Sequence, residues 1–363
     1  MPQSAYIHIP FCKSKCNYCS FVSYTNYNED WQKKYIETLI KEIPYFYKNE
    51  PLKTLYLGGG TPSLIKPCNI QEIIKCFNIT KDTEITIEIN PETIDKRYLQ
   101  ELWDTGVNRL SIGIQTFDDN ILKRIGRIHT AQKAIDIIKT AQNLNYKNIS
   151  VDLIYGLPNQ TLEGFIADLN KAIELNIQHV SLYGLKIEEG CKFFEQPPQN
   201  IADDDMQADM YIAAIKILEK NEFKHYEISN FSKEGYESKH NLNYWNSQEY
   251  YGFGAAAHGY DEEQRYSNHT RVEDYLNKYK EKEHKQTLTK QDQLEEAIFL
   301  GLRRSEGINI TEINKKFKIN FNENYKKILE KYTDSKHLIK TQNGYKFSTE
   351  GFLVSNNILA DFL

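Results

Sequence analysis

Six short apolar runs with the period of a β-strand alternate with amphipathic helical segments over the first half of the chain. The strand-like runs lie at residues 5–9, 54–57, 84–89, 109–114, 149–154 and 179–185. Segments with helical spacing follow all but the last of them, at residues 29–43, 69–77, 96–105, 131–142 and 162–175, and Pro44 is expected to end or kink the first helix. Such alternation predicts a parallel sheet with right-handed crossovers.

Six strand-helix units are two fewer than the eight that close a (β/α)8 barrel. The predicted fold is therefore α/β, an open partial (β/α)6 barrel with a lateral gap that admits a large substrate. In such folds the functional groups gather at the carboxyl ends of the strands. The polar residues at or just past the predicted strand ends are Cys12, Gly58, Glu88, Gln115, Asp152 and Lys186.

Three cysteines, Cys12, Cys16 and Cys19, follow the first strand with the spacing C-x3-C-x2-C. Iron–sulfur clusters normally take four thiolates, and structural zinc takes four Cys or His ligands. Three thiols thus predict a [4Fe–4S] cluster with one iron open to another ligand. The spacing closely resembles the signature of the radical S-adenosylmethionine (SAM) superfamily, in which the amine and carboxylate of SAM occupy that iron.

Two other interpretations of the cysteines are weaker. A zinc site would need a fourth ligand, and the nearest candidate, His8, lies in the alternating strand on the opposite face from Ile7 and Ile9. A disulfide is disfavoured because there are 6 cysteines in 363 residues and no secretory signal. Cys68, Cys76 and Cys191 are expected to be buried or incidental thiols.

Charge and hydropathy limit the partners. The net charge of −5 gives no general attraction to nucleic acid or to an anionic membrane. No apolar run approaches the roughly 20 residues that span a bilayer, and Met1 leads almost directly into the first strand. We therefore expect a cytoplasmic protein without a transmembrane segment, while peripheral membrane contact and a homodimer stay open.

Beyond residue 195 the pattern changes. A helix is expected at 203–220, an aromatic-rich stretch covers 225–266, and further helices are expected at 294–302, 310–317 and 323–332 before a hairpin at 337–347 with an Asn343-Gly344 turn. The predicted units are a partial barrel (1–195), a barrel extension (196–285) and a winged-helix-like domain (286–363). Residues 281–363 carry 14 Lys plus Arg against 12 Asp plus Glu, a balance of +2 that disfavours DNA binding.

The polar residues at the strand ends suggest a ligand site. The run Gly58, Gly59, Gly60 and Thr61 lets the backbone approach a ligand closely, as a site for the SAM amino group requires. Glu88 interrupts an apolar strand, and a buried carboxylate needs hydrogen bonds, here from ribose hydroxyls. Gln115 and Asp152 end their strands in the same way. Arg127 follows Gln115 and is expected to hold the SAM carboxylate with two parallel bonds.

The whole chain resembles the family of oxygen-independent coproporphyrinogen III oxidases, and more closely its heme-chaperone branch. The motifs are YIHIPFC (6–12), GGGTPS (58–63), EINP (88–91), RLSIGIQ (109–115) and DLIYGLP (152–158). The resemblance implies a cluster on Cys12, Cys16 and Cys19. It implies that one SAM is held by Tyr6, Gly58, Glu88, Gln115, Arg127 and Asp152, and that Tyr18, Gly59 and Gly60 touch a second SAM where the family has one.

Two features separate the chaperones from the oxidases, which carry a further cysteine where this chain has Phe21 and have a longer N-terminal segment. The motif HNxxYW at 240–245 matches the chaperone branch and is linked to heme binding. His240 is therefore the candidate ligand for heme iron, with His258 as its rival. We expect a carrier that delivers heme to respiratory hemoproteins. The alternative is an oxidase that decarboxylates coproporphyrinogen III to protoporphyrinogen IX.

Overall fold

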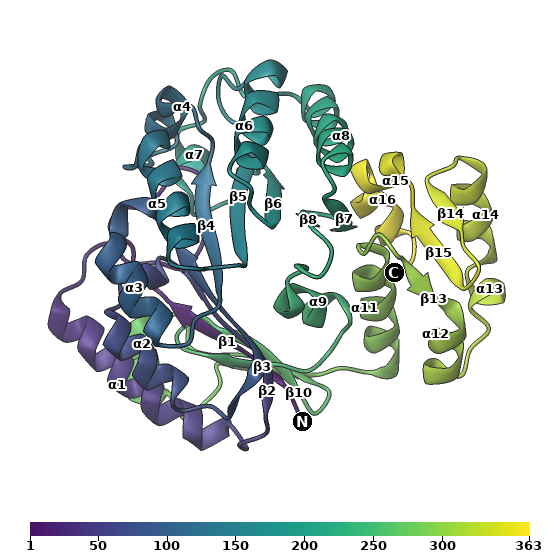
Figure 1. Ribbon diagram of the computed structural model, residues 1–363. Helices are drawn as coiled ribbons and strands as arrows, with labels where there is room; N and C mark the ends of the chain where they lie inside the picture. Colours follow the sequence, from purple (N-terminus) through teal and green to yellow (C-terminus); the bar gives the residue numbers. More distant parts are fainter.

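The computed structural model describes all residues, 1–363, and is built on one nine-stranded sheet (Figure 1). Its strands lie in the order β7-β8-β6-β5-β4-β3-β2-β1-β9, which has two free ends. The six predicted strands are parallel: β1 (Ser4–Ile9), β2 (Leu52–Gly59), β3 (Ile79–Ile89), β4 (Arg109–Gln115), β5 (Ile149–Tyr155) and β6 (His179–Gly184). The predicted open partial barrel is confirmed.

Helices follow the strands along the outer face of the sheet (Figure 1). They are α1 (Glu29–Phe46), α2 (Pro67–Ile74), α3 (Lys96–Asp104), α4 (Asp119–Arg124), α5 (Ala131–Asn143) and α6 (Leu162–Glu174), with 3-10 turns at Pro62–Leu64 and Pro91–Thr93. Pro44, which was expected to end or kink the first helix, lies in the last turn of α1, and the helix ends at Phe46.

Alternation along the strands separates an apolar outer layer from a polar interior. On β3, Ile85, Ile87 and Ile89 are buried in the hydrophobic core, whereas Glu88 faces a cavity on the inner side. The inward positions of the other strands carry Tyr, His, Ser, Thr, Arg and Asp. The inside of the partial barrel is therefore a place for polar ligands rather than a packed apolar core.

Three strands of the main sheet come from the aromatic-rich stretch, where none was predicted. β9 (Tyr251–Phe253) pairs with β1 in parallel, while β8 (Asn230–Ser232) pairs antiparallel with β6 and with β7 (Lys224–Glu227). Strands of three or four residues are too short to show a period. The remaining elements here are α7 (Lys192–Glu195), α8 (Asp204–Lys220), α9 (Lys239–Trp245), α10 (Val272–Lys278) and the sheet of β10 (His258–Asp261), β11 (Gln264–Ser267) and β12 (His284–Thr287).

A buried polar cluster ties this middle segment to α1. The carboxylate of Glu42 is fully buried and accepts hydrogen bonds from Gly254 N (2.9 Å), Asn268 Nδ2 (2.8 Å), the Tyr275 hydroxyl (2.8 Å) and Lys282 Nζ (3.2 Å). Every lone pair of the buried charge is thus used, which is the condition for tolerating it in the core.

The C-terminal part is a winged-helix-like unit, yellow-green to yellow in Figure 1. It contains α11 (Lys290–Leu302), β13 (Ile308–Asn309), α12 (Ile310–Phe317), α13 (Phe321–Asn324), α14 (Lys326–Asp334), β14 (Leu338–Lys340), β15 (Gly344–Phe347), α15 (Thr349–Leu353) and α16 (Ser355–Ala360). The hairpin is confirmed, but its turn was misplaced. Gly344 opens β15 and pairs with Asn309, where a Cβ would meet Ile308 O at 2.0 Å.

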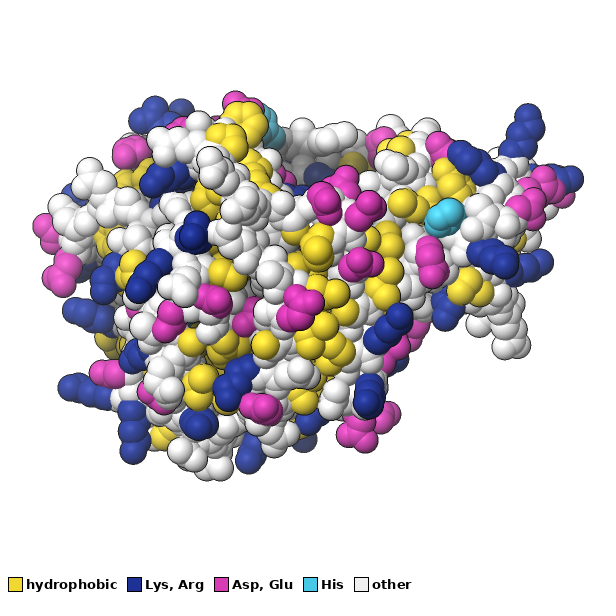
Figure 2. Space-filling model, turned by 90° about the horizontal axis from the view of Figure 1, so that it is seen from above, with side chains coloured by type: hydrophobic (Ala, Val, Ile, Leu, Met, Phe, Trp, Pro, Cys, Tyr) yellow, Lys and Arg dark blue, Asp and Glu magenta, His cyan; other side chains and the backbone are white.

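None of the helices has the length and apolar character needed to cross a membrane. Figure 2 looks down on the molecule and shows Lys and Arg side chains interspersed with Asp and Glu, beside a band of hydrophobic side chains. On this face no large area carries charge of a single sign.

Candidate functional site

The three cysteines lie on a loop whose neck is closed by two backbone hydrogen bonds, Cys12 N to Tyr24 O (3.0 Å) and Tyr24 N to Pro10 O (2.7 Å). Asn17 fastens the loop to the end of α4, since its backbone N–H donates to Ile125 O at 2.9 Å. Burial raises the pKa of the Cys12 thiol and raises that of Cys19 to about 11. Both sulfurs thus sit where a thiolate needs a cation to offset its charge.

A cavity of about 430 Å³ lies above the carboxyl ends of the parallel strands. Eleven of the predicted site residues line it: Cys12, Cys16, Tyr18, Cys19, Gly59, Gly60, Thr61, Glu88, Gln115, Arg127 and Asp152. No three His, Cys, Asp or Glu side chains are placed to hold a single metal ion. A four-iron cluster is bulkier than one ion and spaces its thiolates more widely, so three thiols around one cavity fit a cluster better than zinc.

The glycine run brings β2 against the start of the cysteine loop. Gly60 N donates to Ile9 O at 2.9 Å, and a Cβ on Gly60 would meet the Phe11 and Ile9 carbonyl oxygens at 2.8 and 2.9 Å. Gly59 has φ +109°, and its N–H donates to Glu88. Both N–H groups donate within the protein, so only the carbonyl oxygens of Gly59 and Gly60 remain for a ligand. Carbonyl oxygens accept hydrogen bonds, and an ammonium group can donate them.

Two carboxylates flank β4 on the inner side of the sheet. The Glu88 carboxylate accepts hydrogen bonds from the Tyr56 hydroxyl (2.9 Å) and from Gly59 N (3.0 Å). Burial, and then the charge of Asp152, raises its pKa to about 7. Burial also raises the pKa of Asp152, which accepts from the Ser111 hydroxyl at 3.0 and 3.1 Å. Both groups have spare lone pairs and lie in the same cavity, as receptors for hydroxyl groups must.

Arg109, which was not predicted as a site residue, lies on β4 between the two strands that carry these carboxylates. Its side chain is 1% exposed, and its Nε has no hydrogen-bond partner. Its charge lowers the pKa of both Glu88 and Asp152. An arginine in a strand is normally expected to face solvent. Only the structure, in which this side chain lies on the inner side of the sheet, shows its role.

Gln115 enters the cavity through a backbone irregularity. The pairing of β4 with β5 shifts register between Gly113 and Gln115, and Gln115 has φ +73°. A Cβ on Gly113 would meet Gln115 Nε2 at 2.9 Å. The bulge therefore turns the Gln115 amide back over the end of β4.

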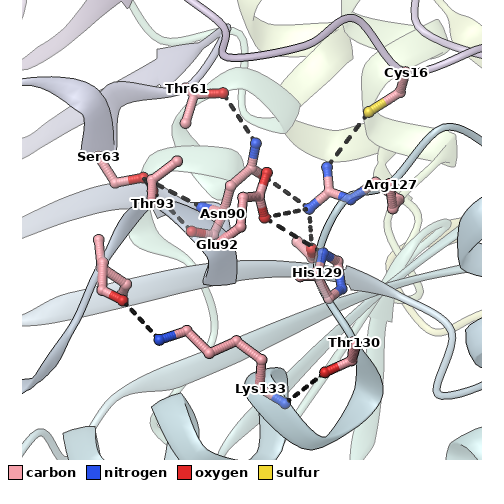
Figure 3. A network of polar contacts seen from close by, with 12 residues as sticks. Cys16, Thr61, Ser63, Asn90, Glu92, Thr93, Arg127, His129, Thr130 and Lys133 are labelled. Atoms are coloured by element: carbon pink, nitrogen blue, oxygen red, sulfur yellow. Dashed lines mark hydrogen bonds and ion pairs between the residues drawn. The ribbon is translucent and has the colours of Figure 1, made fainter.

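Arg127 is already held by protein groups (Figure 3). Its Nη2 donates to Gly113 O (2.6 Å) and Asn90 Oδ1 (2.9 Å), and its Nη1 donates to Cys16 Sγ (3.5 Å). Glu92 lies 4.0 Å from Nη2 and 3.4 Å from His129 Nδ1. The predicted clamp with two parallel bonds is not available in this arrangement, because Nη2 is fully used. Nη1 and Nε remain, and they permit a single bond to a carboxylate.

Three predicted residues lie outside the cavity lining. Tyr6 hydrogen-bonds with His8 Nδ1 (3.0 Å), and Gly58 packs behind Glu88, where a Cβ would meet Oε1 at 2.9 Å. The His8 imidazole also bonds Val22 O through Nε2 (3.0 Å). Burial lowers the His8 pKa to about 4. Both of its nitrogens are thus occupied, which removes it as a fourth ligand for a zinc site.

His240 is the third such residue. It is 1% exposed, with Nδ1 bonded to Thr54 Oγ1 and Nε2 bonded to the Tyr244 hydroxyl, both at 2.7 Å. Neither nitrogen is free for iron. Heme ligation by His240 stays a prediction, and it requires that at least one of these two hydrogen bonds break to free a ring nitrogen.

Comparison with known proteins gives two matching family models and several related proteins. A family model for the radical SAM superfamily matches residues 6–172, and one for the HemN C-terminal domain matches residues 288–354. The heme chaperone HemW of Lactococcus lactis subsp. lactis (strain IL1403) is 37% identical over 371 residues, covering 100% of this chain and 97% of that protein. The heme chaperone HemW of Bacillus subtilis (strain 168) is 33% identical over 381 residues, covering 99% of each.

A solved structure shares the whole fold. Coproporphyrinogen III oxidase (HemN) from Escherichia coli, a radical SAM enzyme, matches with a TM-score of 0.86 over 99% of this chain and 90% of that chain, at 21% identity. This likeness establishes the architecture, including the C-terminal unit.

Proposed function

Because the chain belongs to the HemW family of radical SAM heme chaperones, we propose that it binds heme and transfers it to respiratory hemoproteins. The observation that carries this proposal is the relationship to named heme chaperones over the full length of both chains. We further propose that the protein acts in the cytoplasm, that it assembles as a homodimer and that it delivers heme at a membrane surface through peripheral contact.

The radical SAM domain implies a [4Fe–4S] cluster and SAM. We assign the cluster to Cys12, Cys16 and Cys19, which share one cavity wall. In the SAM site, Glu88 and Asp152 would accept from ribose hydroxyls, Gln115 would close the cavity, and the carbonyls of Gly59 and Gly60 would take the amino group. Arg127 would make one bond to the carboxylate. When bound, the pair supplies one-electron reductive chemistry.

For the heme iron we favour His258 over His240. His258 lies at the start of β10, its side chain is exposed, and it makes no hydrogen bond within the protein. A neutral imidazole with a free nitrogen is the usual axial ligand for heme. The exposed Phe21, which stands where the oxidases have a further cysteine, lines the mouth of the cluster cavity.

The test compares heme binding with porphyrinogen turnover in one anaerobic preparation that carries about four irons per chain. We expect heme to bind at micromolar affinity or tighter, read from its absorption spectrum, and we expect no protoporphyrinogen from coproporphyrinogen III with SAM and a strong reductant. His258→Ala should shift the heme spectrum, whereas His240→Phe should leave it unchanged. Turnover at the rate of a genuine oxidase, measured in parallel, would contradict the carrier function and show that the protein is an oxidase.

A further inference from the structure

The helix that carries the HNxxYW motif, α9, lies against the inner face of the sheet at β2 and β3 and closes this side of the partial barrel. The backbone N–H groups of Lys239 and His240 point at the carboxylate of Glu84 on β3, at 3.4 and 3.3 Å, and Ser238 caps the helix by accepting from Asn241 N. Glu84 is 4% exposed. A buried carboxylate at a helix N-terminus holds that helix in place, so α9 is fixed to the sheet it closes.

The two sides of α9 face different environments. His240 and Tyr244, one turn apart, lie on the side of the sheet, where they bond each other and Thr54. Leu242 and Trp245 line a groove of about 1590 Å³ that also takes in residues of the C-terminal unit. The helix thus lies between the inner face of the sheet and this groove, whose lining also includes Thr54 of β2.

On the inner side, the His240 ring stacks on the Tyr56 ring, with centroids 5.0 Å apart and planes at 26°. Tyr6 stacks on the same tyrosine at 6.2 Å and 28°. The Tyr56 ring is therefore held between the His240 and Tyr6 rings, and this packing fixes the direction of its hydroxyl group. It donates to Glu88 Oε1 at 2.9 Å, while Glu88 Oε2 accepts from Gly59 N.

We propose that His240 and Tyr56 are positioning residues of the SAM site: α9 holds the Tyr56 ring, and Tyr56 holds the Glu88 carboxylate in its ribose-binding orientation. The inference rests on the proposed SAM site. It gives the chaperone motif a role in SAM binding that is separate from heme ligation, and it explains why both nitrogens of His240 are used inside the protein.

Electrostatics give this arrangement a measurable signature. A hydrogen bond from Tyr56 favours the ionised form of Glu88, against burial and against the charge of Asp152 on β5. The other groups that face Glu88 are Gly59 on β2, Arg109 on β4, Tyr6 on β1, Tyr183 on β6 and Tyr244 on α9. Loss of the Tyr56 hydroxyl should therefore raise the pKa of Glu88 further and leave more of this carboxyl protonated near neutral pH than in the unaltered chain.

The test measures SAM affinity by equilibrium dialysis on the full chain with its cluster, from about pH 6 to pH 9. Tyr56→Phe should weaken SAM binding at least about tenfold at pH 7, the loss expected for a hydrogen bond to a charged group, and the deficit should shrink as pH rises. His240→Ala should weaken binding severalfold, and His240→Phe should restore most of it by keeping the stacked ring. Iron content should stay constant throughout.

His225→Ala is the matched control, because it removes another buried imidazole that stacks on a ring, Phe231, away from Glu88. Its SAM affinity should equal that of the unaltered chain. SAM affinity within twofold of the unaltered chain for both Tyr56→Phe and His240→Ala, at every pH, would overturn the proposal. So would an unaltered chain that binds no SAM. Loss of heme binding in His258→Ala with these SAM effects intact would concern only the carrier function.

Discussion

Glu88 shows how one side chain combines a cost in stability with a use in binding. Its carboxylate sits in the inner wall of the sheet, bonded to Tyr56 and Gly59, with a second carboxylate, Asp152, in the same cavity. Arg109 compensates both without contacting either as an ion pair. Such a group is poorly placed for the empty protein and well placed for a ligand that brings hydroxyl donors and positive charge.

Replacing Glu88 by Gln should therefore stabilise the SAM-free protein above neutral pH. Burial raises the pKa of Glu88 from 4.5 to about 7, so the folded chain holds a proton that the unfolded chain releases. The stability this group contributes is full below about pH 4.5 and is lost as pH rises to about 7. Urea unfolding should show the variant gaining, relative to the unaltered chain, up to about 3 kcal/mol across this window.

The same variant should lose most of its SAM affinity, because an amide places a donor where the ribose needs an acceptor. The free energy of unfolding of both proteins is measured at pH 5 and at pH 8. If the difference between the variant and the unaltered chain is the same at both pH values, Glu88 is ionised throughout this range and its role is structural.

At the scale of elements, the long helices and the six inner strands were predictable because each shows its period over many residues. β7, β8 and β9 were not, since three or four residues carry no period and their partners β6 and β1 are distant in sequence. The cavity residues were predictable from their places at strand ends. The partners of Arg127 and His240 were not, because they depend on which inner side chains meet across the sheet.

The Glu42 cluster joins α1 to β9 and α10, and it should control the stability of that junction. Glu42→Ala would leave Lys282, whose side chain is 4% exposed, without its counter-charge, and we expect a loss of about 3–5 kcal/mol in the free energy of unfolding. Glu37→Ala is the control on the same helix. Its carboxylate is 51% exposed and lies 3.9 Å from Lys33, so the change should stay within about 0.5 kcal/mol.

Chemical denaturation with urea measures both variants under identical conditions. Equal losses in the two would show that α1 is held by its apolar face alone, without help from the buried charge.

In the whole molecule the cluster cavity lies at the carboxyl ends of the parallel strands, and α9 lies on the same inner face of the sheet, nearer the amino ends of these strands. A wide groove lies between α9 and the C-terminal unit. The division at residues 195 and 285 stays a prediction, and the main sheet draws strands from both sides of residue 195. The arrangement has the same architecture as an oxidase, so the fold does not separate carrier from enzyme. The two functions differ in the fate of the tetrapyrrole, because a carrier transfers heme unchanged whereas the oxidase converts coproporphyrinogen III into protoporphyrinogen IX.

Heme transfer tests the carrier function most directly. The full chain, with its cluster and one equivalent of heme, is mixed with an excess of apomyoglobin, which traps heme that dissociates spontaneously, and separately with membranes that contain a respiratory apo-cytochrome. Absorption spectra follow both reactions. A carrier delivers heme within a complex, so transfer to the cytochrome should be faster than release to the trap. Equal rates, or a chain that retains no heme, would contradict the account.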